Sequence, residues 1–377
     1  MSLVSRARTI YREEGPLELF HRTKRFALHE IFPQMIWGIL PEPETKRLVG
    51  RFRLSTTLYY YLRGTFYDEQ RALLYGQARY TEDESRRDDP VHSVIRQTHR
   101  IEKGLSMRNR RDIFAEGYIE AHLEGVRTAA GRFWNGNTDD EQLQWVLDVL
   151  DAYFSVVERT PPIERAYRTY RELLEELGYE PGDRRPFPRK ELADRPVDYD
   201  SFRQLAENRV STRWFREAEV DRELIDDAIS AAVESPSACN RQSFRFLVFD
   251  DPDRIETLAD IPGGAKGYRH NIPCLVVLVG RQRAYFHDRD KHVIYIDGSL
   301  AAMSFQYALE SLGLASCCIN WQAIPRNQRR IREELSLDED EKIIMFIAVG
   351  HPDPDGYIPY SGKKSLDNVR TFNPDGG

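Results

Sequence analysis

The stretch CLVVLV at residues 274–279 decides the fold class of the C-terminal half of this chain. An unbroken apolar run of this length, rich in β-branched valine, is typical of a strand buried on both faces. Two similar runs occur, FRFLVF at 244–249 and IIMFIAV at 343–349. Helical patterns alternate with these runs, so the sequence predicts a layered α+β domain in which helices flank a sheet.

Two helices are predicted beside the strands. Apolar residues recur at helical spacing from Leu224 to Val233, behind Asp221, and Ser235 and Pro236 end the stripe. A segment rich in Ala and Ser from about residue 298 to 312 predicts the second helix. Because Asp is favoured at helix N-termini, we expect Asp297 to cap it.

The N-terminal half is predicted to be mostly α-helical. Apolar residues between Leu143 and Val157 recur at helical spacing behind Thr138 and Glu141, which match a capping box. A second helix should end at Gly178. The segment 178–196 holds four prolines among charges, where a helix cannot persist. We therefore predict a helical domain over 1–195 and a second domain over 196–377.

Composition excludes several classes of protein. The 377 residues are 41% hydrophobic and 31% charged, which is typical of a globular protein and excludes wholesale disorder, collagen and coiled coil. Acidic residues outnumber basic ones, 61 to 54, so a general nucleic-acid binder is not expected. Cys239, Cys274, Cys317 and Cys318 form no CxxC pair, which favours free thiols in a reducing compartment and a cytoplasmic location.

The first sixty residues carry ten Lys or Arg against six Asp or Glu. No segment is long and apolar enough for a transmembrane helix. The run IFPQMIWGIL at 31–40 follows Arg22, Lys24 and Arg25, which leaves open a membrane-surface contact near residues 20–40. Burial in the helical domain is the simpler interpretation. The basic string at 99–111 could line the substrate entrance or bind an anion, but a charged, solvated helix face is the simpler interpretation.

Common catalytic motifs are absent: GxGxxG, the P-loop, GxSxG and HExxH do not occur, and no His or Cys cluster predicts a metal site. Cations and planar amides remain as candidates for ligand binding. Arginine and lysine suit a phosphate monoester, and Asn and Gln offer both donor and acceptor to a flavin-like or pterin-like ring. They lie in three strings, NRVSTRWF at 208–215, SPSACNRQ at 235–242 and SGKKSL at 361–366.

The order and spacing of these strings resemble the nitroreductase family of FMN-dependent oxidoreductases. The resemblance covers about residues 200–370 and includes ESPSACNRQSFRF, DGSLAAMSFQYALESLGLASCCI and AVGHP. It implies a central, mainly antiparallel sheet and a homodimer with FMN at the subunit interface. It also implies NADH or NADPH as electron donor and ping-pong transfer to a small-molecule acceptor.

The resemblance also implies a set of site residues. FMN phosphate and ring oxygens would be bound by Arg209, Ser211 and Arg213, and Lys363 and Lys364 would complete the phosphate site. The loop that packs on the partner's flavin would be Pro236, Ser237, Asn240 and Gln242. Ile319 and Asn320 would lie where a backbone N–H meets flavin N5. The flavin itself would carry the hydride, so no catalytic His or Cys is needed.

Three positions depart from the family pattern: Val210 replaces a usual Arg, Ser243 and Phe244 replace Pro and Trp, and Asn320 and Trp321 stand at a usually glycine-like position. The first removes a polar contact, and the others alter the pocket. Two alternatives therefore remain beside an oxidoreductase. One is a non-catalytic flavin-binding or scaffold protein whose helical domain carries the interaction. The other is a different flavin reaction, such as dehalogenation, ring dehydrogenation or flavin-consuming chemistry.

Overall fold

The computed structural model describes residues 42–86, 90–194 and 196–373. The predicted membrane-surface contact near residues 20–40 lies outside the described residues. The chain divides into two compact units, residues 1–71 and 72–377. In the smaller unit, α3 (Glu42–Gly50) is followed by α4 (Arg53–Arg63), whose first turn donates two hydroxyl hydrogen bonds to the Val49 carbonyl at 2.8 Å. Helix α5 (Tyr67–Arg86) begins in this unit and continues into the larger one.

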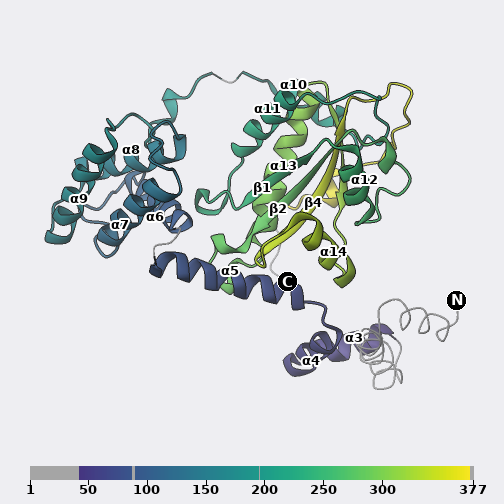
Figure 1. Ribbon diagram of the computed structural model, residues 1–377, viewed down its shortest axis with the longest axis horizontal. Coiled ribbons are helices and arrows are strands. Elements are labelled where there is room, and N and C mark those ends of the chain that lie inside the picture. The colour runs from purple at the N-terminus through teal and green to yellow at the C-terminus, as the bar shows by residue number, and fades with distance from the viewer. Residues whose placement is uncertain (1–41, 87–89, 195, 374–377) are drawn as a thin grey trace. The chain divides into compact units, whose positions relative to one another are not determined.

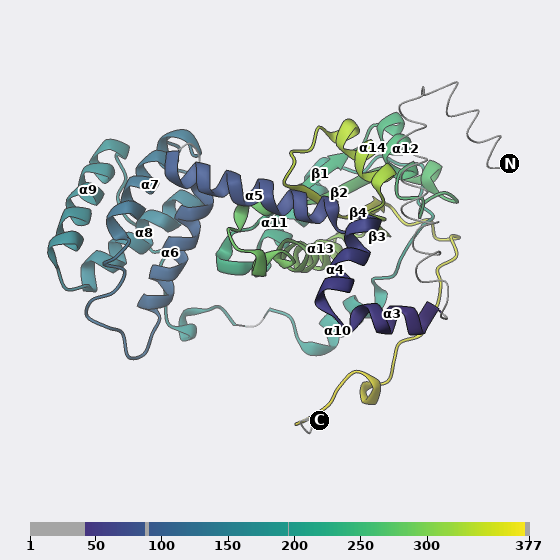
Figure 2. The same ribbon diagram turned by 90° about the horizontal axis from the view of Figure 1, so that it is seen from below.

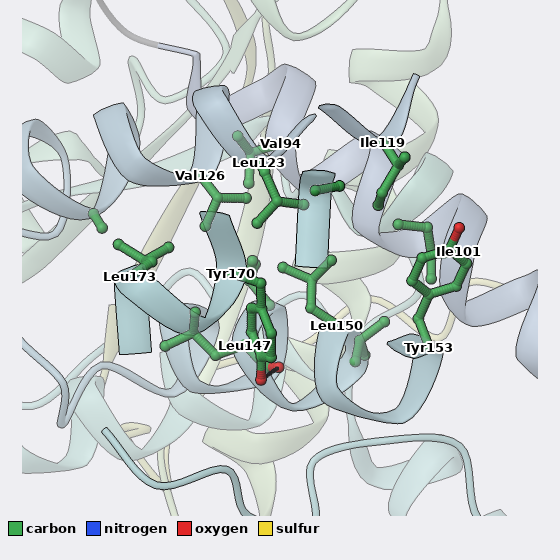
Figure 3. Close-up of a cluster of buried hydrophobic side chains, with 14 of the residues drawn as sticks. Val94, Ile101, Ile119, Leu123, Val126, Leu147, Leu150, Tyr153, Tyr170 and Leu173 are labelled. Atoms are coloured by element: carbon green, nitrogen blue, oxygen red, sulfur yellow. Dashed lines mark hydrogen bonds between the residues drawn. The ribbon is translucent and has the colours of Figure 1, made fainter. Parts of the chain in front are cut away.

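Helices α6 to α9 form a bundle within the larger unit (Figure 2). Their bounds are Val91–Leu105 for α6, Ile119–Arg132 for α7, Glu141–Val156 for α8 and Pro161–Leu177 for α9. Leu123, Leu147 and Leu150 are fully buried at the centre (Figure 3). Gly178 ends α9 with a φ of 62°, as predicted. The N-cap of α8 is Asp140, so the predicted capping box was wrong; the Asp140 carboxylate accepts the free N–H groups of the first turn.

The segment after the bundle is tied back to it by Asp148, a fully buried carboxylate on α8. Asp148 accepts hydrogen bonds from the Tyr179 hydroxyl at 2.9 Å, the Gly182 N–H at 2.8 Å and the Arg184 N–H at 2.9 Å. The proline-rich segment is thus non-helical, as its sequence predicts, but fixed at its start. The domain division at residue 195 stays a prediction.

A four-stranded antiparallel sheet forms the centre of the remaining residues. Its order is β1 (Phe244–Phe249), β2 (Cys274–Arg281), β4 (Glu341–Gly350) and β3 (Ala315–Asn320). The three apolar runs are therefore strands, and the α+β class with a mainly antiparallel sheet is confirmed. Every residue of β2 from Cys274 to Gly280 is buried, because helices cover both faces of the sheet.

Successive side chains of β2 point to opposite faces of the sheet, and a different pair of helices covers each face (Figure 1). Val276 and Leu278 pack with α11 (Arg222–Val233) and α13 (Val293–Ser311). Leu275 and Val277 pack on the other face with α12 (Pro252–Asp260) and α14 (Pro325–Leu335). Helix α10 (Tyr199–Asn208) precedes this layered arrangement in the chain.

The C-terminal part of α5 packs against the segment after β2. Gly76 is buried there, and a Cβ at this position would lie 2.7 Å from the backbone carbonyl carbon of Gln282. Glycine is unfavourable inside a helix, so its presence here is explained by this close approach. Nearby, the Gln77 amide donates to Asp288 at 2.7 Å, and Tyr80 stacks on Phe286.

Candidate functional site

The first group of predicted site residues lies at the beginning of edge strand β3. Arg209 caps the C-terminus of α10. Ser211 then forms a parallel bridge with Ser316, and the Thr212 N–H donates to the Ser316 carbonyl at 3.1 Å. This short pairing brings Arg209, Ser211 and Arg213 to one end of the sheet.

The two arginines of this group have no ion-pair partner in the described part of the chain. Both are partly buried. Arg213 donates to the Ser211 carbonyl at 3.4 Å and lies over the Tyr268 ring. Burial raises the pKa of the Glu310 carboxyl, and the positive charge of Arg209 opposes that shift. Two partly buried guanidinium groups without a paired carboxylate suit a phosphate anion.

Ile319 and Asn320 lie at the other end of β3. The Ile319 side chain is 2% exposed and packs into the core on the α12 and α14 face. A ligand at this strand would therefore meet the backbone of Ile319 rather than its side chain. Asn320 is exposed at the strand end.

The second group forms a tight loop before β1. The Ser237 hydroxyl accepts the Gln242 N–H at 3.0 Å, and the Asn240 side-chain oxygen accepts the Gln242 amide at 3.2 Å. Cys239, Asn240 and Gln242 have φ values of 56°, 53° and 47°. Non-glycine residues adopt this left-handed region at an energetic cost, so surrounding contacts must hold the loop. Pro236 is exposed at its start.

Asp297 provides one of those contacts, and its predicted role as a helix cap was wrong. Helix α13 begins earlier, at Val293, because the residues before Asp297 continue the helix. The Asp297 carboxylate is 3% exposed and accepts the Ala238 N–H at 3.2 Å and the Tyr285 hydroxyl at 2.6 Å. Burial raises the pKa of Asp297, while these two hydrogen bonds oppose the rise. Sequence reasoning also missed Tyr285, for which no local signal exists.

The two groups of site residues cannot meet within one copy of the chain. Ser316 aligns with Val349 and, through it, with Cys274, whereas Phe244 aligns with Gly280 at the opposite end of β2. The edge strands β1 and β3 are three strand spacings apart across the sheet, about 14 Å. Along the strands, the two reference positions on β2, Cys274 and Gly280, are six residues apart, about 20 Å. The groups therefore lie on opposite edges and toward opposite ends of the sheet.

Lys363 and Lys364 lie on the exposed segment after β4. Within the described ranges they form no ion pair, and no hydrogen bond joins them to either group of site residues. Their part in a phosphate site stays a prediction.

The basic string at 99–111 lines a groove of about 420 Å³ at the end of α6. Arg100 and Lys103 contribute to its wall, and the Arg100 guanidinium lies 4.2 Å from the centre of the Tyr118 ring. The string is thus only partly helical, since α6 ends at Leu105.

All four cysteines are free thiols. Among the described residues, no group of three or more His, Cys, Asp or Glu side chains is placed to hold a metal ion. No helix in the ranges that the structure describes is long and apolar enough to cross a membrane.

The fold is a layered α+β domain, and the predicted site residues form two groups in it, one at the start of β3 and one at 236–242; we call these two groups half-sites. Residues 206–266 and 264–351 match the model of the nitroreductase family. The C-terminal half of the chain therefore carries a nitroreductase-family domain, as its motifs predict.

Several known proteins are similar to this chain. Iodotyrosine deiodinase 1 from Sus scrofa is 25% identical over 259 residues, which cover 61% of this chain and 83% of that protein. Iodotyrosine deiodinase from Nematostella vectensis is 22% identical, covering 45% and 73%. Among solved structures, an FMN-dependent nitroreductase from Clostridium difficile aligns with a TM-score of 0.39 and 25% identity, covering 45% of this chain and 98% of that one.

Proposed function

We propose that the protein is an FMN-dependent oxidoreductase that passes electrons from NADH or NADPH to a small-molecule acceptor. The observation that carries this proposal is the match of residues 206–351 to the nitroreductase family, because that segment contains both half-sites. The solved nitroreductase that aligns here is itself FMN-dependent. The free thiols favour a cytoplasmic location.

The half-site at β3 would hold the phosphate end of FMN. Arg209 and Arg213 supply positive charge that no ion pair in the described residues neutralises, and the Ser211 hydroxyl adds a further donor. We assign Lys363 and Lys364 to the same phosphate on sequence resemblance. Ile319 and Asn320 would pass the ring, with the buried Ile319 side chain fixing the strand beneath it.

The half-site at 236–242 would act on the flavin of a second copy. One copy holds the two groups on opposite edges of its sheet, so a homodimer that places each loop against the partner's β3 would complete two sites. Asn240 and Gln242 would then present amide donors and acceptors to the ring. Asp297 would keep the loop in shape through its hydrogen bond from Ala238.

Bound FMN would supply the redox chemistry, taking two electrons from the nicotinamide donor and giving them to the acceptor in alternate half-reactions. The protein's residues would bind the phosphate, orient the ring and exclude water. The residues that we assign to the site include no general base, which agrees with a reaction in which the cofactor carries the hydride.

The resemblance to iodotyrosine deiodinases supports a second candidate, reductive removal of a halide from an aromatic ring. In that reaction a carbon–halogen bond is replaced by a carbon–hydrogen bond, which consumes two electrons and one proton and releases halide. Asn320, which departs from the usual family pattern and is exposed at the end of β3, would shape the acceptor side of such a site, whereas Trp321 packs into the core against Phe346.

The test is the visible absorption spectrum of the full-length protein, before and after anaerobic addition of NADH or NADPH. Flavin bands that bleach on reduction would support the proposal, and a quinone, a nitroaromatic and iodotyrosine offered in turn would separate the acceptor classes. Flavin bands that neither donor bleaches would favour a non-catalytic flavin-binding protein. A colourless protein that takes up no added FMN would refute the proposal.

A further inference from the structure

A cavity of about 360 Å³ lies within the larger unit, between the bundle and the sheet. The start of α6 and the residues at 133 and 142 line one side, and α11 with the adjoining ends of β1 and β2 line the other. Its wall has two parts: apolar side chains that include Ile229, Val233 and Phe244, and a cluster of arginines. Neither part was predicted from the sequence.

The arginine cluster carries more positive charge than its carboxylates neutralise. Arg245 pairs with Glu341 at 3.1 Å, and Arg283 pairs with Asp338 and Asp340. Arg241 and Arg281 form no ion pair with any described residue. The four arginines therefore exceed these three carboxylates by one positive charge, and Arg241 and Arg281 are the two guanidinium groups without a direct ion-pair partner.

Donor atoms in this cluster are buried without a partner. The Nε–H groups of Arg241 and Arg281 are inaccessible to solvent and make no hydrogen bond; Nδ1 of the neutral His92 imidazole, a donor in one tautomer and an acceptor in the other, is likewise buried and unpaired. Arg241 is only 5% exposed, and its guanidinium lies 4.7 Å from the centre of the Tyr285 ring, which holds it at the wall. Arg241 and Arg281 both line the cavity, and only their Nε atoms are among the buried unpaired atoms, so their terminal guanidinium nitrogens remain to meet an anion there.

The ionisation of neighbouring groups is consistent with uncompensated charge. Burial and the charges of Arg281, Arg241 and Arg283 lower the pKa of His92 to about 3, so its imidazole is neutral. Burial also lowers the pKa of Arg281, with Arg245 and Arg283 adding like-charge repulsion, although Glu341 and Asp340 oppose it. An anion placed among these groups would relieve the repulsion.

We propose that this cavity binds a small organic phosphate, with the phosphate on Arg241 and Arg281 and an apolar portion against Phe244, Ile229 and Val233. A phosphate group suits two guanidinium groups without ion-pair partners, because its oxygens can accept hydrogen bonds from both. The apolar wall selects a phosphate ester over the free ion. Within one chain the cavity is separate from Arg209 and Arg213, which lie at the opposite edge strand. Arg241 and Gln242 in its wall belong to the loop that the proposed homodimer places against the partner's flavin, so the inference rests on the proposed function, and titration with and without FMN distinguishes the two sites.

Isothermal titration of the full-length protein with phenyl phosphate tests this site, both as purified and after saturation with FMN. We expect phenyl phosphate to bind in both preparations, inorganic phosphate to bind more weakly and neutral benzyl alcohol not to bind measurably. Because the cavity belongs to one chain, binding is expected even if no flavin is taken up. Absence of phenyl phosphate binding while FMN binds normally would overturn the inference and leave the proposed function intact. Equal binding of benzyl alcohol would also overturn it.

Variants connect the binding to the arginines. Arg281→Gln should weaken phenyl phosphate binding on the order of tenfold or more, because it removes a charge-assisted contact. Arg289→Gln is the matched control, since that side chain is 77% exposed outside the cavity, and its binding should equal wild type. Arg281→Gln should not lower the melting temperature without ligand, because it relieves repulsion. If it fails to fold, Arg241→Gln replaces it. Wild-type affinity in the folded variant would overturn the assignment.

Discussion

Replacing Asp297 with alanine tests how the loop at 236–242 is held in its conformation. The buried carboxylate joins three elements, since it lies on α13 and accepts from Ala238 in the loop and from the Tyr285 hydroxyl after β2. The loop contains non-glycine residues at positive φ, so it depends on such external contacts. Asp297→Ala should destabilise the protein and weaken FMN uptake together.

The magnitude follows from the two hydrogen bonds. Each bond to a charged acceptor contributes about 1.5 to 3 kcal/mol, which gives about 3 to 6 kcal/mol for both. Removing the carboxylate also removes its desolvation cost, which the raised pKa of Asp297 reveals. We therefore expect a net loss of about 2 to 4 kcal/mol in the free energy of unfolding. Tyr285→Phe removes one of the two bonds and should cost about 1.5 to 3 kcal/mol.

Urea denaturation followed by circular dichroism measures the stability change, and titration with FMN measures the effect on the loop. Asp227→Ala, on the exposed side of α11, is the control and should stay within about 0.5 kcal/mol of wild type. A folded Asp297→Ala protein with wild-type stability and wild-type FMN affinity would refute the reasoning. A loss of FMN affinity without a loss of stability would assign Asp297 to the cofactor directly.

Three further predictions concern other parts of the chain. Arg209→Ala should weaken FMN binding by about 1.5 to 3 kcal/mol, whereas the exposed Arg216→Ala should not; equal flavin affinities in a fluorescence titration would remove Arg209 from the site. Gly76→Ala should lower the melting temperature, because its Cβ would lie 2.7 Å from backbone, while Gly131→Ala, whose Cβ meets nothing within 4 Å, should be neutral or stabilising by up to about 1 kcal/mol. Burial lowers the pKa of His122 to about 3, so its contribution to stability is present above pH 6.5 and is lost as the pH falls toward 3. His122→Leu should therefore reduce the stability lost between about pH 6.5 and 4.5 by about 2 kcal/mol in urea denaturation, and an unchanged pH dependence would contradict this.

The sequence by itself determined three of the four strands and several helix ends, because each of these depends on a few consecutive residues. The apolar runs at 244–249, 274–279 and 343–349 became β1, β2 and β4, because a strand between two helical layers must be apolar on both faces. Asp221 caps α11 and Gly178 ends α9, since capping is decided by one or two residues. The family motifs likewise predict the residues of both half-sites, and that assignment stays a prediction.

Tertiary structure alone decided which distant residues meet. The order β1-β2-β4-β3 places the two half-sites on opposite edges, a separation that the spacing of motifs along the chain does not contain. Asp297 suits a helix cap by composition, but the earlier start of α13 carries it into the core, where Tyr285 and Ala238 bind it. The positive cavity joins His92 on α6 to Arg241 and Arg281, more than a hundred residues further along the chain. Long-range packing creates such a cluster, because the charged groups that meet in the cavity come from elements that are far apart in sequence.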